Sequence, residues 1–174
     1  MTLSAYAART LVACVAAMVC GCSTAVRTNP INIELGSAAV SHLPPRPVTL
    51  RNGHASESEL LFSMSQQTLV VEPKHMTETA VEALRRTLDK YLPPKLKTAP
   101  KSVTLWVTSP RSAGEYPTPG VAISLEARFG DGTRTLVYAE GYSARGTERS
   151  FEVALQNGLN QLLSDQQFVE YMKR

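Results

Sequence analysis

Cysteine, histidine and tryptophan are scarce in this chain of 174 residues, which has three cysteines, three histidines and one tryptophan. All three cysteines lie at or before residue 22, so the rest of the chain cannot depend on disulfides. A cysteine zinc site fails on ligand count, because no second ligand pair follows the first. A basic block is also missing, since the net charge of +3 comes from interspersed acids and bases. A nucleic-acid-binding surface is therefore excluded.

A membrane-spanning run is missing as well. The strongest apolar run covers residues 10–21, well short of the roughly 20 residues that a transmembrane helix needs. A short segment that contains Arg9 and no acidic residue precedes it, which is the layout of a secretory signal. We therefore expect residues 1–21 to be a cleaved signal peptide.

The end of this run reads Val19-Cys20-Gly21-Cys22 and resembles the bacterial lipobox. The resemblance implies that the Cys22 thiol carries a diacylglyceryl group and that cleavage follows Gly21. Val19 replaces the commoner leucine, and Cys20 stands where alanine or serine is usual. The alternative is that Cys22 is a buried or disulfide-bonded cysteine. After cleavage it would be the last cysteine left, and a lone thiol is a liability in an oxidising compartment.

The lipobox also implies a location. Two or more acyl chains on one residue give stable membrane attachment. Residue 23 is serine and not aspartate, which under the sorting rule of enteric bacteria implies the outer membrane, with the domain facing the periplasm.

The remaining chain is long enough for one domain. Residues 22–46 are rich in small and polar residues and contain Pro30 and Pro44-Pro45, so we expect a lipidated N-terminus and a flexible tether. A short edge strand at residues 31–35 is the alternative for part of it. Residues 47–174 are expected to form a single domain.

Hydrophobic periodicity predicts the elements of this domain. Alternation predicts strands at residues 47–51, 68–71, 102–109, 121–129 and 133–143, while residues 60–62 suit either a strand or a short helix. Apolar stripes predict helices at residues 77–92, from about 147 to 163, and briefly near the C-terminus. The fold class is therefore α+β, a two-layer sandwich with two main helices packed on one face of a mixed four- to five-stranded sheet.

Helix ends are predicted from capping residues. Thr77 is the expected N-cap of the first helix, and Thr147 or Ser150 that of the second. Ser164 with Gln167 three residues later resembles a capping box for the last helix.

Candidate catalytic residues do not form a set. His42, His54 and His75 lack metal-ligand spacing, and the scattered carboxylates sit at ordinary helical or turn positions. Ser143 lies between Gly141 and Gly146, which is one residue too long for a nucleophile elbow. We therefore expect no catalytic site, no cofactor and no metal.

One face of the predicted sheet is the candidate interaction surface. If the apolar positions of the central strands face the helices, then Trp106, Arg128, Tyr138 and Tyr142 point away from them. These residue types are enriched at interface hot spots. The alternative is that residues of the tether cover this face.

A lipobox, a short tether and a small α+β domain are together similar to small envelope lipoproteins of the YajG type, and more distantly to LptE and to auxiliary lipoproteins of transport systems. Membrane tethering and the absence of a catalytic set favour a non-enzymatic, lipid-anchored protein that binds a protein partner in an envelope transport or assembly complex, through the exposed sheet face or the sheet edge. Two alternatives remain. One is a lipid-anchored hydrolase of the cell envelope that uses Ser143 or a pair of glutamates brought together by the fold, and the other is a module that binds lipopolysaccharide or peptidoglycan.

Overall fold

The computed structural model describes residues 26–27, 33–64, 67–93, 99–114, 118 and 120–174. The expected signal peptide and Cys22 lie outside these residues.

The main sheet has four strands. They are β2 (Val48–Asn52), β5 (Lys101–Gly114), β6 (Gly120–Phe129) and β7 (Arg134–Tyr142), in the order β2-β5-β6-β7. β2 pairs parallel with β5, and the other pairs are antiparallel. The predicted hairpin and the mixed sheet are confirmed, although β5 continues five residues beyond the predicted strand end.

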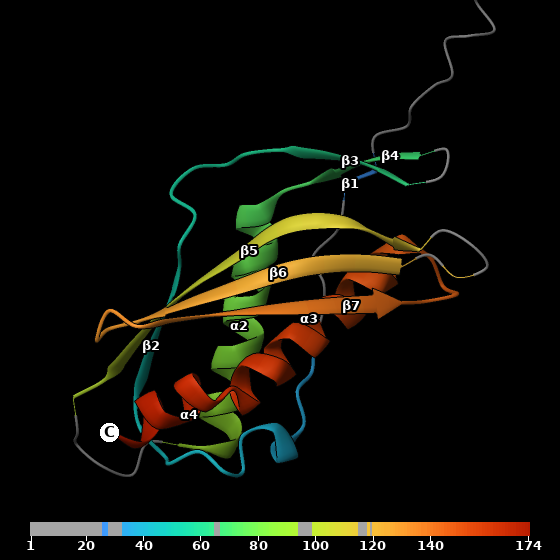
Figure 1. The fold of residues 1–174 in the computed structure, drawn as a ribbon. Helices are drawn as coiled ribbons and strands as arrows, with labels where there is room; N and C mark the ends of the chain where they lie inside the picture. The colour runs from blue at the N-terminus through green and yellow to red at the C-terminus, as the bar shows by residue number, and fades with distance from the viewer. Residues whose placement is uncertain (1–25, 28–32, 65–66, 94–98, 115–117, 119) are drawn as a thin grey trace, which may run out of the picture.

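A second, smaller sheet was not predicted as a separate unit. It contains β1 (Val26–Arg27), β4 (Gln67–Val71) and β3 (Leu60–Met64), in the order β1-β4-β3. The ambiguous residues 60–62 are thus in a strand. Figure 1 shows this sheet above β5, with which β3 is in contact.

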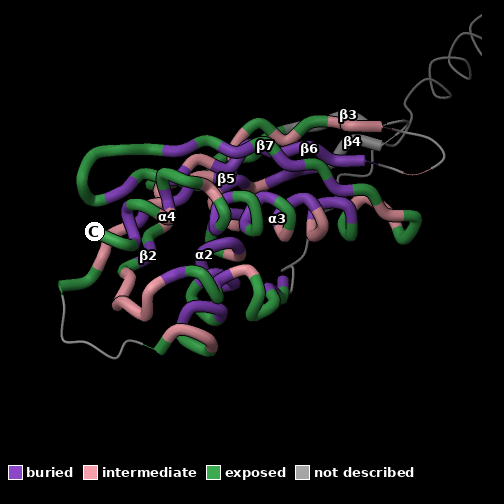
Figure 2. The backbone as a smooth tube through the Cα atoms, turned by 60° about the horizontal axis from the view of Figure 1, so that its bottom comes forward, coloured by how far each residue is buried: buried purple, intermediate pink, exposed green. Residues whose placement is uncertain are grey.

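Helices cover one face of the main sheet, as Figures 1 and 2 show. α2 (Pro73–Tyr91) packs on β2 and β5, and α3 (Thr147–Ser164) packs on β6 and β7. α4 (Gln166–Lys173) continues from α3 to the C-terminus. The apolar stripes of α2 and α3 meet the inward residues of the strands in one core. The predicted α+β class and the one-sided helix layer are confirmed.

The start of α2 differs from the prediction. The helix begins at Pro73. The N–H of the first helical residue has no partner within the helix, so proline, which has no N–H, is favoured at this position. Thr77 therefore lies inside the helix, where its hydroxyl donates to Pro73 O (2.8 Å) and accepts from Val107 N (2.8 Å). It links α2 to β5 and does not cap the helix.

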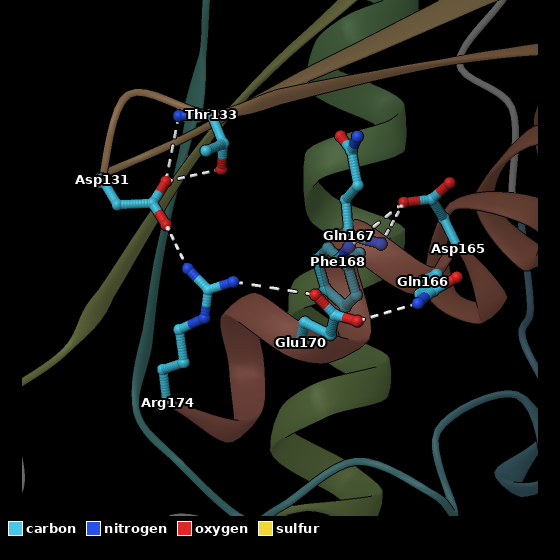
Figure 3. Close-up of polar contacts among 8 residues, drawn as sticks. All are labelled: Asp131, Thr133, Asp165, Gln166, Gln167, Phe168, Glu170 and Arg174. Atoms are coloured by element: carbon cyan, nitrogen blue, oxygen red, sulfur yellow. Dashed lines mark hydrogen bonds and ion pairs between the residues drawn. The ribbon is translucent and has the colours of Figure 1, made fainter.

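The predicted caps of the other helices are also wrong. Gly146 precedes α3 and makes no side-chain cap bond, while the Ser150 hydroxyl donates back to Gly146 O (3.2 Å). Asp165 caps α4, since its carboxylate accepts from the N–H groups of Gln167 (2.9 Å) and Phe168 (3.1 Å), as Figure 3 shows. The Ser164 hydroxyl instead bonds within α3.

Residues 33–46 are not part of a free tether. Ile33, Leu35, Val40 and Leu43 are buried in the core, and the short helix η1 (Ser37–Ala39) lies between them. His42 Nε2 lies 2.9 Å from Leu163 O, which joins this segment to α3. We call residues 33–46 the N-terminal strap. The tether prediction fails here because four spaced apolar residues among prolines can still fill a groove beside the helices.

Candidate functional site

The two faces of the main sheet differ in cover. On β7, Thr135, Val137, Ala139 and Gly141 are buried, whereas the residues between them are exposed. The inward residues of β5 and β6 are buried under the helices. The face away from the helices therefore carries the alternate residues, which include Trp106, Arg128, Tyr138 and Tyr142.

Strand register brings residues of three strands into one row. Trp106 on β5 is opposite Glu126 on β6, which is opposite Leu136 on β7. Arg128 lies in the next row, with its guanidinium carbon 4.7 Å from the Trp106 ring centroid and its Nε 2.7 Å from Glu126 Oε1. An indole face and a carboxylate thus hold this guanidinium over the sheet.

Trp106 also rests on the turn after β2. A Cβ added to Gly53 would lie 1.8 Å from Trp106 Cε2, so only glycine leaves room for the indole ring. Gly53 N donates to Leu105 O (2.8 Å), which fixes this turn along β5. The Asn52-Gly53 signal in the sequence predicted the turn, but not its contact with the tryptophan.

Tyr142 covers a glycine pair at the other end of the face. Gly114 and Gly120 are opposite each other, and Tyr142 is opposite Gly120. A Cβ on Gly120 would lie 2.3 Å from Tyr142 Cε1. The Tyr142 hydroxyl donates to Glu140 Oε2 (2.8 Å), and this bond to a carboxylate raises the pKa of Tyr142.

The candidate interaction surface is thus an apolar and aromatic patch with a built-in ion pair. We call it the outer sheet face and define it by its six members, Trp106, Glu126, Arg128, Leu136, Tyr138 and Tyr142. Leu136, Tyr138 and Tyr142 are 47%, 63% and 48% exposed, so the alternative in which tether residues cover this face does not hold for the described part of the chain.

A second concave region lies between the β6–β7 hairpin and α4 (Figure 3). Its cavity of about 470 Å³ is polar. Arg174 reaches both Asp131 Oδ2 (3.7 Å) and Glu170 Oε2 (3.6 Å). Hydrogen bonds from the Thr133 side chain and backbone, together with nearby Arg174, hold the pKa of Asp131 below its ordinary value. The charges here pair with one another, so the region ties the C-terminus to the hairpin.

The catalytic candidates bond to the backbone and not to one another in the contacts that the structure shows. Ser143 Oγ accepts from Arg145 N (3.1 Å). The His42 ring contacts Leu163 O and the His54 ring contacts Val107 O, while His75 lies in the first turn of α2. Among the described residues, no three histidine, cysteine, aspartate or glutamate side chains gather as metal ligands.

Comparison with known proteins found a similar solved structure but no sequence relative. No protein-family model matches the sequence, and no curated protein matches it. The structure is similar to the crystal structure of protein XCC0632 from Xanthomonas campestris, whose description names the family DUF330. The TM-score is 0.49 at 12% sequence identity, and the match covers 86% of this chain and 95% of that chain. None of the helices in the described residues is both long and apolar enough to cross a bilayer.

Proposed function

We propose that this protein is a non-enzymatic envelope lipoprotein, held at the outer membrane by acyl chains on Cys22, that binds a protein partner of an envelope transport or assembly complex. The outer sheet face is its binding surface. The observation that carries the proposal is the exposure of Leu136, Tyr138 and Tyr142 beside the stacked Trp106–Arg128 pair.

The residue types on the outer sheet face favour a protein partner over an anionic saccharide as its ligand. Tryptophan, tyrosine and arginine provide large contact areas and dominate binding energy at protein interfaces. Glu126 offsets the charge of Arg128 and also lies 3.9 Å from Arg134 Nη1. A lipopolysaccharide site would instead need an excess of positive charge toward its phosphate groups.

Partner binding is tested by crosslinking and pull-down from solubilised envelopes with the full chain. We expect Trp106→Ala and Arg128→Ala each to reduce capture of the same protein by tenfold or more, the order of magnitude of a hot-spot loss. Arg85→Ala is the matched control, because Arg85 is an exposed, ion-paired arginine on α2. Unchanged capture by both outer-face variants would refute the surface. Capture of lipopolysaccharide or peptidoglycan with the same sensitivity would favour that alternative instead.

Membrane attachment has a separate test. Cys22→Ala should abolish palmitate labelling and release the chain from the membrane fraction, because the lipidated thiol is lost. Cys20→Ala is the control and should leave both unchanged. If the Cys22 variant is still labelled, the lipobox assignment is wrong.

A further inference from the structure

β7 forms one edge of the main sheet. β7 is the last strand in the order β2-β5-β6-β7, and within the described residues nothing pairs with its other side. In an antiparallel pair, residues alternate between bonding to the neighbour and pointing outward. Phe129 N donates to Thr133 O (2.9 Å), so the odd-numbered residues of β7 bond to β6. The even-numbered residues therefore direct their N–H and C=O groups to the open edge.

The hydrogen bond of Asn157 agrees with this assignment of even-numbered residues to the open edge. Its Nδ2 donates to Glu140 O (2.8 Å), a carbonyl of an even-numbered residue that α3 reaches from the side. The open stretch thus runs from Arg134 to the N–H of Glu140, and Leu136 and Tyr138 lie in its middle.

The middle of this edge lacks the usual protection against pairing. Exposed edges are usually protected by charged residues, proline, a bulge or a covering element. On β7 (RTLVYAEGY) the charged residues Arg134 and Glu140 flank the middle of the edge, which has no proline and pairs with β6 without a register shift. β5, by contrast, is irregular between Thr108 and Arg111. β7 is therefore a regular template for a further strand.

We propose that the further strand is β7 of a second copy of this chain. The two strands run antiparallel about a two-fold axis at Val137, so that Arg134 is opposite Glu140 of the second copy, and Leu136 is opposite its Tyr138. Both pairs occur twice because of the symmetry. The two four-stranded sheets become one sheet of eight strands, and the two outer sheet faces become continuous.

Charge complementarity selects this register. Only shifts of two residues in the pairing keep the outward N–H and C=O groups aligned. Moving the axis to Tyr138 would put Leu136 opposite Glu140 and lose both ion pairs. Arg134 is 73% exposed and lies 3.9 Å from Glu126, a weak contact that leaves its guanidinium accessible.

The helix α3 lies on the inner face of β7 and β6, beside the proposed contact. A Cβ on Gly158 would lie 3.4 Å from Ala139 on β7 and within 3.9 Å of Leu125 and Ile123 on β6. At Gly158, α3 therefore lies over both β7 and β6, and Asn157 of the same helix reaches the Glu140 carbonyl at the edge. In the paired molecule the two α3 helices need about 8–10 Å between their axes, which is more than the strand spacing of about 4.8 Å, so α3 and its copy set how closely the two β7 strands approach.

Charge reversal tests the pairing. The full chain in detergent is measured by sedimentation velocity over a range of protein concentrations, and wild type is expected to dimerise. Arg134→Glu or Glu140→Arg places like charges opposite each other twice, so we expect dimer affinity to fall about tenfold or more. The double variant restores opposite charges and should recover dimerisation.

A second variant tests the backbone bonds. Leu136→Pro removes an N–H that points to the open edge and should abolish dimerisation, with circular dichroism as the check on folding. The proposal would be overturned if wild type were monomeric at all concentrations, or if the double variant did not recover dimerisation. Trp106→Ala should leave the dimer intact, so a failure of partner binding and a failure of self-association are distinguishable.

Discussion

At the residue scale, glycines set the closest contacts of the fold. Gly141 lies where β7 passes under α3, and a Cβ there would lie 2.2 Å from Ser150 O and 2.3 Å from Ala154 N. Both atoms belong to the helix backbone, which cannot rotate away as a side chain can. The absence of a side chain at this position therefore fixes the distance between the helix layer and the sheet.

Gly141→Ala should be strongly destabilising for this reason. We expect a loss of about 3 kcal/mol or more in the free energy of unfolding, at the upper end of overpacking effects. Gly36→Ala is the matched control, because nothing lies within 4 Å of a Cβ there and its φ is −75°. Urea unfolding of both variants checks this, and equal stability of the two would contradict the close contact.

Asp131 should make stability depend on pH. Its pKa is lowered in the folded state by the Thr133 hydrogen bonds and by Arg174, so the unfolded state binds the proton more tightly. The stabilisation is therefore present above the ordinary aspartate pKa and is lost as the pH falls through the lowered value. Asp131→Asn should lower stability at about pH 6 and have a smaller effect at about pH 2.5. An equal loss at both pH values would assign the effect to the changed shape of the turn.

At the element scale, α4 depends on its cap. The helix is only eight residues long, so its stability comes from its first turn and from the burial of Phe168, Tyr171 and Met172. The Asp165 carboxylate satisfies two N–H groups of that turn. The next residue back, Ser164, satisfies none of them.

Asp165→Ala should destabilise the protein by about 1 kcal/mol, as the loss of an N-cap usually does. Ser164→Ala should change stability by less than about 0.5 kcal/mol, because its hydroxyl bonds only to carbonyls within α3. Thermal unfolding of the two variants distinguishes the observed cap from the one that the sequence suggested. The reverse order of effects would restore Ser164 as the cap.

The helix starts illustrate how far sequence reasoning extends. Periodicity located the strands and the main helices, because a buried face requires apolar residues at fixed intervals. Thr77, Thr147, Ser150 and Ser164 were all plausible caps, since each can accept a hydrogen bond near a helix start. Which residue caps depends on where the chain leaves its preceding element, and that is a tertiary property. Pro73 and Asp165 carried the usable signals.

At the scale of the whole molecule, the N-terminal strap belongs to the core. Its four buried apolar residues belong to the hydrophobic core, and Gln156 Nε2 on α3 donates to Glu34 O (3.1 Å). Composition predicted a tether because prolines disfavour regular structure. Irregular chain can nevertheless be packed, and neither periodicity nor propensity detects such packing.

Leu43→Ala should therefore cost about 2–5 kcal/mol in the free energy of unfolding, the range for a buried leucine. Ser41→Ala, at an exposed position of the same segment, should have little effect. Urea unfolding is the measurement. A flexible tether would leave both variants as stable as wild type.

The outer sheet face was predictable because strand alternation assigns side chains to faces. The side-chain contacts on this face were not predictable. The stacking of Arg128 on Trp106 depends on strand register, and the contact of Trp106 with Gly53 depends on a turn from a distant segment. The open edge of β7 also required the strand order, because the sequence does not show which strand ends a sheet.

The pairing of β1 with β4 limits how far the domain can move from a lipid anchor. Val26 is paired with Leu69 and follows Cys22 by four residues, which span at most about 14 Å when fully extended. An acylated Cys22 would then be a lipid anchor that keeps the small sheet within that distance of the bilayer. In the proposed dimer, the two small sheets would lie on the β5 sides of the two copies, away from the shared β7 pair. Both lipid anchors would reach the same bilayer if the two-fold axis were parallel to the membrane normal. The joint sheet of the dimer would then lie parallel to the membrane surface.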